Sequence, residues 1–236
     1  MRCVLLHGFA GYPASWDEVA IEGDRIALPG HAGGGPLANS WAGNLAAIAA
    51  RIGACDVVIG YSLGARVALG LVAGGFAPRG VLISVNPGIA DAERPARRAG
   101  DARWAALARH SGTAAFIAAW EAQALFATQA RAAPAVRAAR HARRLALEPE
   151  QLARSLETMG LAEMPDYRDA VDHRFALIAG GDDAKYVAIA RALGAPLEIV
   201  PGSGHDPLLE QPAALNLAIQ RAIRGGARRD PAAGGC

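Results

Sequence analysis

A serine held between two glycines is the strongest chemical signal in this chain of 236 residues. The run Gly60–Gly64 reads GYSLG; it follows a short apolar stretch, Asp56–Ile59, and precedes a stretch of helical length. A G-x-S-x-G run between a strand and a helix makes a sharp turn, which holds the serine hydroxyl at the end of the sheet, above the amino terminus of the helix. We therefore expect Ser62 to do chemistry rather than to be an ordinary turn serine.

A serine hydroxyl at its ordinary pKa is a weak nucleophile and needs a neighbouring base. Of the six histidines, only His205 lies late in the chain in a glycine-rich loop directly after a strand-like run, Leu197–Val200. The acid that orients this base should follow the preceding strand, where Asp182 and Asp183 stand side by side. The G-x-x-D spacing favours Asp183, with Asp182 as the rival, so the sequence predicts a triad of Ser62, Asp183 and His205.

A negative oxygen that forms during the reaction needs two backbone N–H groups directed at it. Leu63, the residue after the serine, supplies one N–H group, and Phe9 in the early run HGF supplies the other. His7 begins that run and His31 lies in the following loop of sequence LPGH. We interpret both histidines as structural residues of their loops rather than as the base.

Alternating strands and helices must position these residues. Five short runs without polar alternation predict strands buried on both faces of a parallel sheet. They are Cys3–Leu6, Asp56–Ile59, Val81–Val85, Phe175–Ala179 and Leu197–Val200. The helical stretches between and after them are Trp41–Ile52, Leu63–Gly74, Ala184–Leu193 and Ala213–Arg224. This order predicts an α/β protein with right-handed crossovers.

The alternation stops between residues 90 and 169, where no strand-like run occurs. Alanine- and arginine-rich helical segments replace it, at Arg94–Arg109, Thr113–Ala127, Ala135–Leu147 and Glu150–Gly160. We expect residues 1–89 and 170–224 to form the core, and residues 90–169 to form a helical lid inserted into it. Residues 225–236, rich in glycine, alanine and arginine, are expected to be a flexible tail.

Positive charge is concentrated in this helical insertion. From Arg94 to Arg154 there are eleven arginines and four acidic residues, a formal charge of +7, whereas the whole chain carries +2. A general preference for arginine does not explain this asymmetry, because the rest of the chain is net negative. Since a guanidinium binds a carboxylate through two parallel hydrogen bonds, the pattern predicts a small carboxylate-bearing substrate beneath the insertion.

Composition excludes several other classes of protein. A hydrophobic fraction of 52% with 19% charged residues is too apolar for a disordered chain, and the net charge of +2 gives no case for nucleic-acid binding. Three cysteines without CxxC spacing argue against a disulfide scaffold and a zinc site. The amino-terminal apolar run is too short for a signal peptide, and no run is long enough to span a membrane. We expect a cytoplasmic protein; its oligomeric state does not follow from the sequence.

The order Ser, Asp, His and the surrounding motifs resemble the α/β-hydrolase fold. Within that fold the chain resembles the 2-succinyl-6-hydroxy-2,4-cyclohexadiene-1-carboxylate synthases of menaquinone biosynthesis, over nearly its whole length. The shared motifs are LHGFAG from Leu6, LPGH from Leu28, GYSLGAR from Gly60, NPGI from Asn86, Glu93-Arg94, Asp101-x-x-Trp104, Trp120 with Gln123 and Phe126, Met159-Gly160-Leu161 with Pro165, and Gly180-x-x-Asp183-x-Lys185-Tyr186. The chain departs from the family pattern at Glu121, Ala124, Glu148 and Asp206-Pro207.

Members of this family perform no hydrolysis. Their triad removes a proton from 2-succinyl-5-enolpyruvyl-6-hydroxy-3-cyclohexene-1-carboxylate, and pyruvate is eliminated. The resemblance thus implies that Ser62 is a general base activated by His205, that the two N–H groups hold enolate charge, and that no metal or organic cofactor takes part. The family positions that contact the substrate match five residues here, which are Tyr61, Arg66, Arg97, Trp120 and Arg144.

Two other functions remain open on the same fold. One is a serine esterase or thioesterase that acts on a small anionic ester through an acyl-enzyme, since the same triad serves both reactions. The other is a catalytically silent binding protein, against which the intact triad argues. The arginines favour a polyanionic substrate, unless Arg66, Arg97 and Arg144 are a solvated helix face and Trp120 only packs within the insertion.

Overall fold

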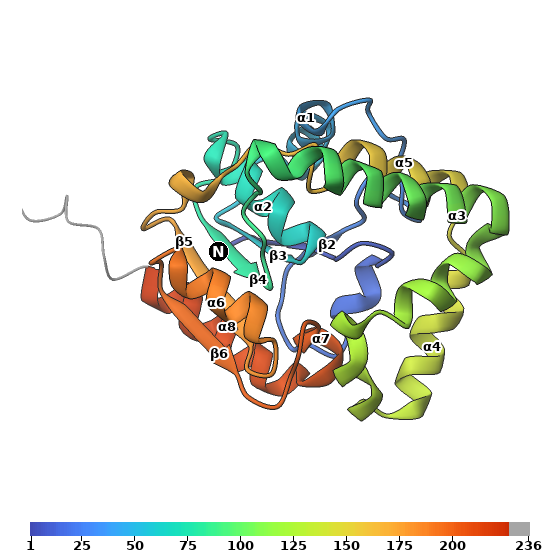
Figure 1. The fold of residues 1–236 in the computed structure, drawn as a ribbon. Helices are drawn as coiled ribbons and strands as arrows, with labels where there is room; N and C mark the ends of the chain where they lie inside the picture. The colour runs from blue at the N-terminus through green and yellow to red at the C-terminus, as the bar shows by residue number, and fades with distance from the viewer. Residues whose placement is uncertain (227–236) are drawn as a thin grey trace, which may run out of the picture.

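The computed structural model describes residues 1–226, so most of the predicted flexible tail, residues 227–236, lies outside the described residues. Six parallel strands form one sheet in the order β2-β1-β3-β4-β5-β6 (Figure 1). Their bounds are β1 Cys3–Leu6, β2 Asp24–Ile26, β3 Val57–Tyr61, β4 Gly80–Ile83, β5 Phe175–Gly180 and β6 Leu197–Val200. The five strands expected from the sequence are all present; β1 and β6 have the expected bounds, and the ends of the other three differ by at most two residues.

Two strand features differ from the sequence expectation. Strand β2 was not expected, because two of its three residues, Asp24 and Arg25, are charged and exposed, so it has no apolar run. Strand β4 ends before Ser84, whose φ of 52° lies in the left-handed region and turns the chain out of the sheet. Ser84 is thereby placed at the carboxyl edge of the sheet, where Ser62 also lies.

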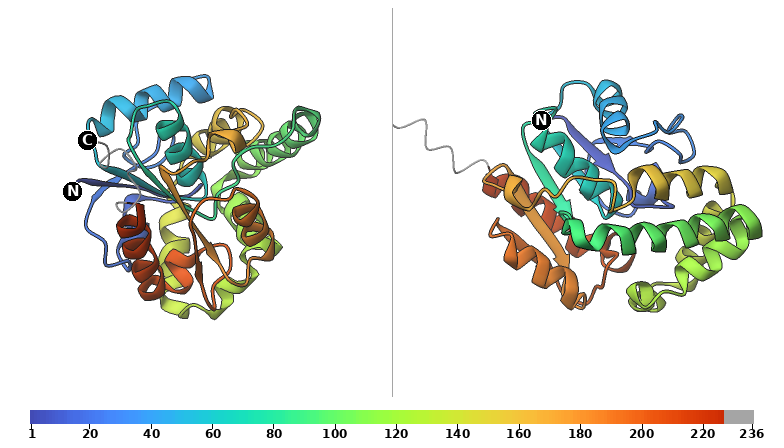
Figure 2. Two further views of the ribbon diagram at one scale, coloured as in Figure 1. Left: turned by 90° about the vertical axis from the view of Figure 1, so that its left-hand side faces the viewer. Right: turned by 45° about the horizontal axis from the view of Figure 1, so that its top comes forward.

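Helices cover both faces of the sheet, as the uninterrupted apolar runs predict. One face packs against α1 (Trp41–Ile52), α2 (Leu63–Ala73) and α6 (Ala184–Ala192), and the other against α8 (Pro212–Gly226), as Figure 2 shows for α1, α2 and α8. Successive residues of a strand enter opposite cores: Leu6 and Val58 lie in the first core, Leu5 and Ile59 in the second. The sheet is therefore the buried middle layer of three.

Residues 90–169, all of which the structure describes, contain helices and turns but no strand. The longer elements of this helical insertion are α3 (Arg94–Glu121), the 3-10 helix η3 (Ala124–Arg131), α4 (Pro134–Leu145) and α5 (Pro149–Met159). They lie to the right of and above the sheet in Figure 1. Helix α3 is broken at Gly112, with φ 76° and ψ 175°, within the gap that the sequence leaves between Arg109 and Thr113. The expected helix Thr113–Ala127 is wrong in its last turns, where η3 replaces it.

Two glycines set how closely α2 approaches the sheet. A Cβ atom on Gly64 would overlap the carbonyl oxygen of Leu6 in β1, and one on Gly60 would overlap the backbone of Gly64 itself. Backbone therefore packs directly on backbone where β1, β3 and α2 meet. This contact holds the first turn of α2, and with it the residue that precedes the helix.

Gly64→Ala should lower the free energy of unfolding by about 2–3 kcal/mol, because the overlapping atom belongs to a strand that cannot move aside. Gly100→Ala is the matched control: it lies within α3, and the nearest atom to an added Cβ is the end of the Arg103 side chain at 3.8 Å. That change should raise stability by about 0.5–1 kcal/mol. Urea unfolding of both variants measures this, and equal stability of the two would contradict the close approach.

Candidate active site

Ser62 occupies a strained turn between β3 and α2. Its φ and ψ are 52° and −108°, a conformation that costs free energy for a residue with a side chain and is imposed here by its surroundings. The Ser62 N–H group donates to the carbonyl oxygen of Ile83 in β4 at 2.9 Å, and its carbonyl oxygen accepts from Arg66 N–H at 3.1 Å. The turn is thus bonded to the neighbouring strand on one side and to the helix on the other.

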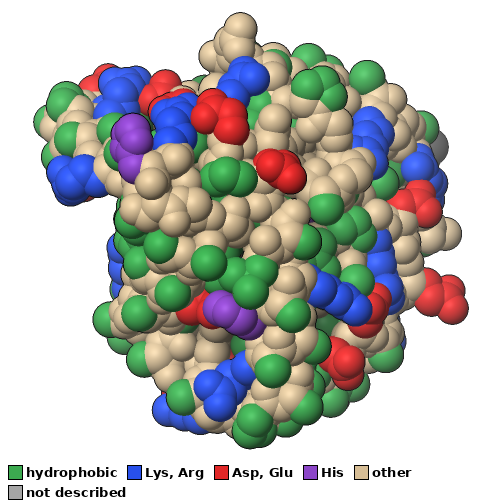
Figure 3. Space-filling view, turned by 90° about the vertical axis from the view of Figure 1, so that its right-hand side faces the viewer, with side chains coloured by type: hydrophobic (Ala, Val, Ile, Leu, Met, Phe, Trp, Pro, Cys, Tyr) green, Lys and Arg blue, Asp and Glu red, His purple; other side chains and the backbone are tan. Residues whose placement is uncertain are grey.

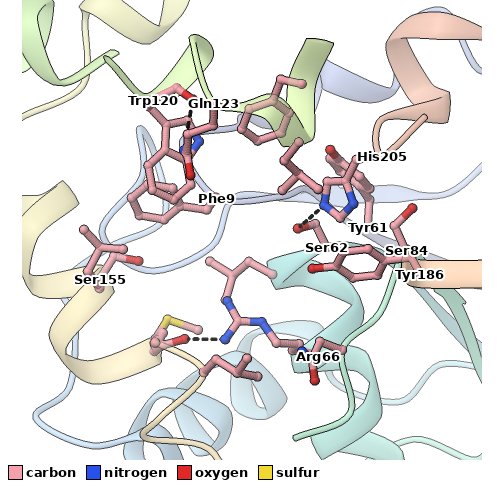
Figure 4. A pocket seen from close by; sticks show the side chains of 18 of the residues that line it. Phe9, Tyr61, Ser62, Arg66, Ser84, Trp120, Gln123, Ser155, Tyr186 and His205 are labelled. Carbon is pink, nitrogen blue, oxygen red and sulfur yellow. Dashed lines mark hydrogen bonds between the residues drawn. The ribbon is translucent and has the colours of Figure 1, made fainter. Parts of the chain in front are cut away.

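A continuous chain of hydrogen bonds leads away from the serine. His205 Nε2 lies 3.2 Å from Ser62 Oγ (Figure 4), and His205 Nδ1 lies 3.0 Å from Asp183 Oδ2. The other carboxylate oxygen of Asp183 accepts from Tyr186 N–H at 3.2 Å, so Asp183 also caps the amino terminus of α6. The His205 and Asp183 side chains are almost completely buried. This geometry can move a proton from Ser62 to His205 and stabilise the resulting imidazolium.

The structure places Asp183, rather than Asp182, against the histidine. The Asp182 carboxylate is part exposed and pairs with Arg131 of η3 at the surface. The two aspartates point in different directions because Asp183 turns inward to cap α6. The G-x-x-D spacing had favoured the same residue.

Aromatic rings enclose His205. The ring of Tyr186 lies 4.4 Å from it, that of Tyr61 at 5.7 Å and that of Phe126 at 6.0 Å, between centroids. Burial raises the pKa of both tyrosines, so both phenols are neutral at physiological pH. Tyr186 ends the motif Gly180-x-x-Asp183-x-Lys185-Tyr186, which does not by itself mark the tyrosine as a residue beside His205.

The N–H groups of Phe9 and Leu63 donate no hydrogen bond to any group within residues 1–226. Leu63 is the first residue of α2, where N–H groups have no partner in the helix, and Phe9 follows β1 in the loop beside the serine. Both groups are therefore free to bind a negative oxygen. Their role as an oxyanion hole remains a proposal that this geometry allows.

Two buried histidines hold the loop that carries Phe9. His7 Nε2 accepts from Leu28 N–H at 3.0 Å and His7 Nδ1 lies 2.8 Å from the carbonyl oxygen of Gly8. His31 Nε2 accepts from Ala10 N–H at 3.1 Å. Burial lowers the pKa of His7 to about 3 and that of His31 to about 4. Both rings are therefore neutral at pH 7, and each bridges the β1 loop to the segment that follows β2.

A cavity opens in front of Ser62 between the core and the helical insertion, and Figure 4 shows its labelled side chains. Ser62 and His205 lie on one side, Phe9 and Trp120 on the other, and Arg66 reaches in from α2. The cavity is lined by every side chain that the resemblance implies for the substrate. These are Tyr61, Arg66, Arg97, Trp120 and Arg144.

Each of the three arginines has a partner of its own. Arg66 Nη1 donates to the carbonyl oxygen of Met159 at 3.0 Å; burial, with the charge of Arg97 nearby, lowers the pKa of Arg66 to about 10, so it stays cationic at pH 7. Arg97 pairs with Asp101 at 2.9 Å. Arg144, itself almost completely buried, pairs with Glu121 at 2.9 Å, and its Nε has no partner among the described residues.

Most other arginines of the insertion do not face this cavity. Arg109 pairs with Glu150 and Glu157, and Arg98 with Glu163, at part-exposed positions. Figure 3 shows the side of the molecule that carries much of the insertion, and at its upper left basic and acidic side chains lie next to one another. The charge of +7 is therefore divided between two cavity residues, Arg97 and Arg144, and arginines that lie elsewhere, several of them paired with acidic residues.

Several polar lining residues were missed from the sequence. Ser84 Oγ and Ser155 Oγ are buried without a hydrogen-bond partner in residues 1–226, and Asn86 and Gln123 also line the cavity. Ser84 lies within the strand expected at Val81–Val85, so its position after the end of β4 could not be read from the sequence. Nothing in the helical pattern around Ser155 distinguishes it from a surface serine. Among the described residues no group of three metal-binding side chains gathers, and no helix could cross a membrane.

Known proteins resemble this chain over most of its length. A model of the alpha/beta hydrolase family matches residues 3–218. The chain is 35% identical to 2-succinyl-6-hydroxy-2,4-cyclohexadiene-1-carboxylate synthase from Klebsiella pneumoniae, over 90% of this chain and 89% of that protein. It is 31% identical to the synthase of the same name from Escherichia coli, over 94% and 93% of the two chains.

Solved structures share the fold. One is MenH from S. aureus, with a TM-score of 0.86 and 22% identity over 97% of this chain and 95% of that one. Another is a thermophilic esterase from Thermogutta terrifontis, with a TM-score of 0.75 and 22% identity over 96% and 90%. At these identities the likeness shows the fold alone, and it does not separate the two kinds of chemistry.

The two buried histidines make stability depend on pH. Their pKa values in the folded protein lie below the ordinary value of 6.5, so the unfolded chain binds more protons at mildly acidic pH. Stability should be complete above about pH 6.5 and should decrease as the pH is lowered, with a slope of about 2.7 kcal/mol per pH unit at pH 5. Urea unfolding from pH 7 to 5 measures it.

His110→Gln is the control. Because His110 is exposed, this substitution should leave the pH dependence of the free energy of unfolding unchanged. His31→Gln should roughly halve the slope, since one of the two titrating groups is removed. A free energy of unfolding that stays constant between pH 6.5 and 5 would show that the two rings are not held neutral.

Proposed function

The chain belongs to the alpha/beta hydrolase family, and we propose that within this family it is a carbon–oxygen lyase which forms 2-succinyl-6-hydroxy-2,4-cyclohexadiene-1-carboxylate in menaquinone biosynthesis. The observation that carries the proposal is the similarity to synthases of that name along about nine-tenths of the chain. The arrangement of Ser62, His205 and three arginines around one cavity supports it chemically.

The chemistry follows from the structures of substrate and product. The substrate, 2-succinyl-5-enolpyruvyl-6-hydroxy-3-cyclohexene-1-carboxylate, has one ring double bond between C3 and C4, and the product has two, at C2 and C4. The proton on C2 must therefore leave, the electron pair must move through the ring, and the bond from C5 to the enolpyruvyl oxygen must break. The released enolpyruvate takes up a proton and becomes pyruvate.

The triad would act on the C2 proton, which is acidic because it stands next to the succinyl ketone. Ser62 Oγ takes this proton while passing its own to His205 Nε2, and Asp183 stabilises the imidazolium through Nδ1. Negative charge then develops on the ketone oxygen. The unpaired N–H groups of Phe9 and Leu63 would bind that oxygen, so the hole holds an enolate rather than a tetrahedral intermediate.

The substrate carries three carboxylates, and three arginines line the cavity. Arg66 already gives one N–H to a backbone oxygen, and Arg97 and Arg144 are part-neutralised by Asp101 and Glu121. Each guanidinium has further N–H groups for a carboxylate. Trp120, whose ring centroid lies 4.8 Å from that of Phe9, offers an apolar wall for the substrate ring, and Tyr61 lies beside His205.

Ser62→Ala and His205→Ala should each lower pyruvate release from the purified substrate by roughly three orders of magnitude or more, with the fold intact. The double variant should be little worse than either, because residues that transfer one proton together fail together. Losses that multiply in the double variant would count against a shared proton-transfer unit.

Asp183→Asn should also lower pyruvate release severely. Asp182→Asn removes only a surface ion pair, so its pyruvate release should be close to that of the unmodified protein.

A parallel assay with p-nitrophenyl esters separates the lyase from the esterase. Rapid ester turnover without pyruvate release would assign the site to an esterase that uses Ser62 as a covalent nucleophile.

Arg66→Ala and Arg97→Ala should each cost roughly 2–4 kcal/mol in kcat/KM, as expected when a charge-assisted hydrogen bond is lost from a part-dry site. Lysine at either position should restore only part of the loss, because it cannot form two parallel bonds. Arg103→Ala is the matched control, since Arg103 lies on α3 like Arg97 but is exposed and outside the cavity.

The comparison that decides the role of the arginines is between anionic and neutral substrates. The loss should appear for substrates that carry carboxylates and be small for a neutral ester. If both kinds of substrate lose activity equally, or neither does, the arginines are not a carboxylate clamp.

A further inference from the structure

Asp206, the residue that follows His205 in the sequence, is a buried acid. Asp206 is fully buried, and its Oδ1 accepts from Leu209 N–H at 3.3 Å, which caps α7 (Pro207–Glu210). Its Oδ2 faces the helical insertion, where it pairs with Arg140 of α4 and accepts from Gln129 Nε2 of η3 at 3.1 Å. Arg140 is 8% exposed. A charge pair is thus buried at the junction of core and insertion.

We propose that Arg140 and Asp206 are positioning residues: their ion pair latches the helical insertion onto the loop of His205 and cancels the acidic charge next to that histidine. The inference rests on the proposed role of His205 as the base. Neither residue belongs to the triad or lines the cavity. The inference gives them a part in setting the pH range in which His205 is neutral.

The insertion contacts the His205 loop on both sides of the histidine. A Cβ atom on Gly204 would overlap Thr128 Oγ1 of η3, and Phe126 of the same element lies 6.0 Å from the His205 ring. Asp206 completes the junction through Arg140. Because residues 204 and 206 both pack against the insertion, its displacement must also disturb the histidine between them.

The ion pair also sets the electrostatics of the site. A buried carboxylate that loses its partner is costly, and a negative charge near an imidazole favours the protonated ring. Asp183 already supplies one negative charge to His205. A second, uncompensated carboxylate would keep the base protonated at higher pH, where it could not accept a proton from Ser62.

The other titratable groups around His205 come from each neighbouring element. Glu210 of α7 accepts from the N–H groups of Gly204 and Asp206, at 2.7 and 3.3 Å, so its carboxylate is bound to the same loop. Tyr186 of α6 and Tyr61 of β3 lie against the ring as neutral phenols. Arg140 is the cation that pairs directly with the acid adjoining His205.

The test is the pH profile of kcat/KM for pyruvate release in three variants. Arg140→Met should move the acidic limb up by about one pH unit, because Asp206 is left unpaired. Asp206→Asn keeps the cap on Leu209 but leaves Arg140 unpaired, and should move the limb in the opposite direction. The double variant should return close to the original profile, and Arg140→Lys should retain most of it.

Arg109→Met is the control. Arg109 is another paired arginine of the insertion, but its partners are Glu150 and Glu157 rather than a residue of the His205 loop. It should leave the profile unchanged. If the two single variants shift the limb in the same direction, or lose stability without any shift, the pair is a structural ion pair only and the inference is wrong.

The titration of the His205 imidazole, followed by NMR without substrate, keeps this test separate from the proposed function. The same opposite shifts should appear there whatever reaction the protein performs. If the opposite shifts appear while Ser62→Ala retains full activity, the proposed function is wrong and the role of the Arg140–Asp206 pair is supported. If the shifts do not appear while Ser62→Ala is inactive, the role of the pair is wrong and the proposed function is supported.

Discussion

The direct packing of α2 on the backbone of β1 and β3 is the constraint from which the site follows. Glycine is the only residue type that fits at positions 60 and 64. The close approach of α2 to the strands that these glycines permit forces Ser62 into a left-handed turn bonded to β4. The serine hydroxyl, the free N–H of Leu63 and the first turn of the helix are thereby fixed together. The position of the serine is a result of backbone packing, since no side chain has to hold it in place.

The remaining parts of the site are brought to that fixed point by buried polar contacts. His7 and His31, both neutral, hold the loop that presents Phe9, and Asp183 combines the cap of α6 with the orientation of His205. The helical insertion then closes the cavity with arginines that are already paired within the protein. Such pairing stabilises cations away from water and still leaves N–H groups for an anionic ligand.

Sequence patterns predicted what depends on local chain geometry and missed what depends on which side chains meet. Buried apolar runs revealed five strands, and the glycines around Ser62 revealed the turn, because each is a requirement on consecutive residues. Strand β2 has no apolar run, so its pairing with β1 could not be inferred. The partners of Arg144 and Arg140, Glu121 and Asp206, are distant in sequence. In the sequence, both acids stand out only as departures from the family pattern.

Under the proposed function, Ser62 removes a proton from carbon instead of attacking a carbonyl group. The most direct measurement compares kcat/KM for pyruvate release from substrate carrying hydrogen or deuterium at C2, in the Asp183→Asn variant, whose slower proton transfer exposes the chemical step. If Ser62 removes the proton, the deuterated substrate should react more slowly, because the bond from C2 to hydrogen breaks in that step. Equal rates for the two substrates would contradict it.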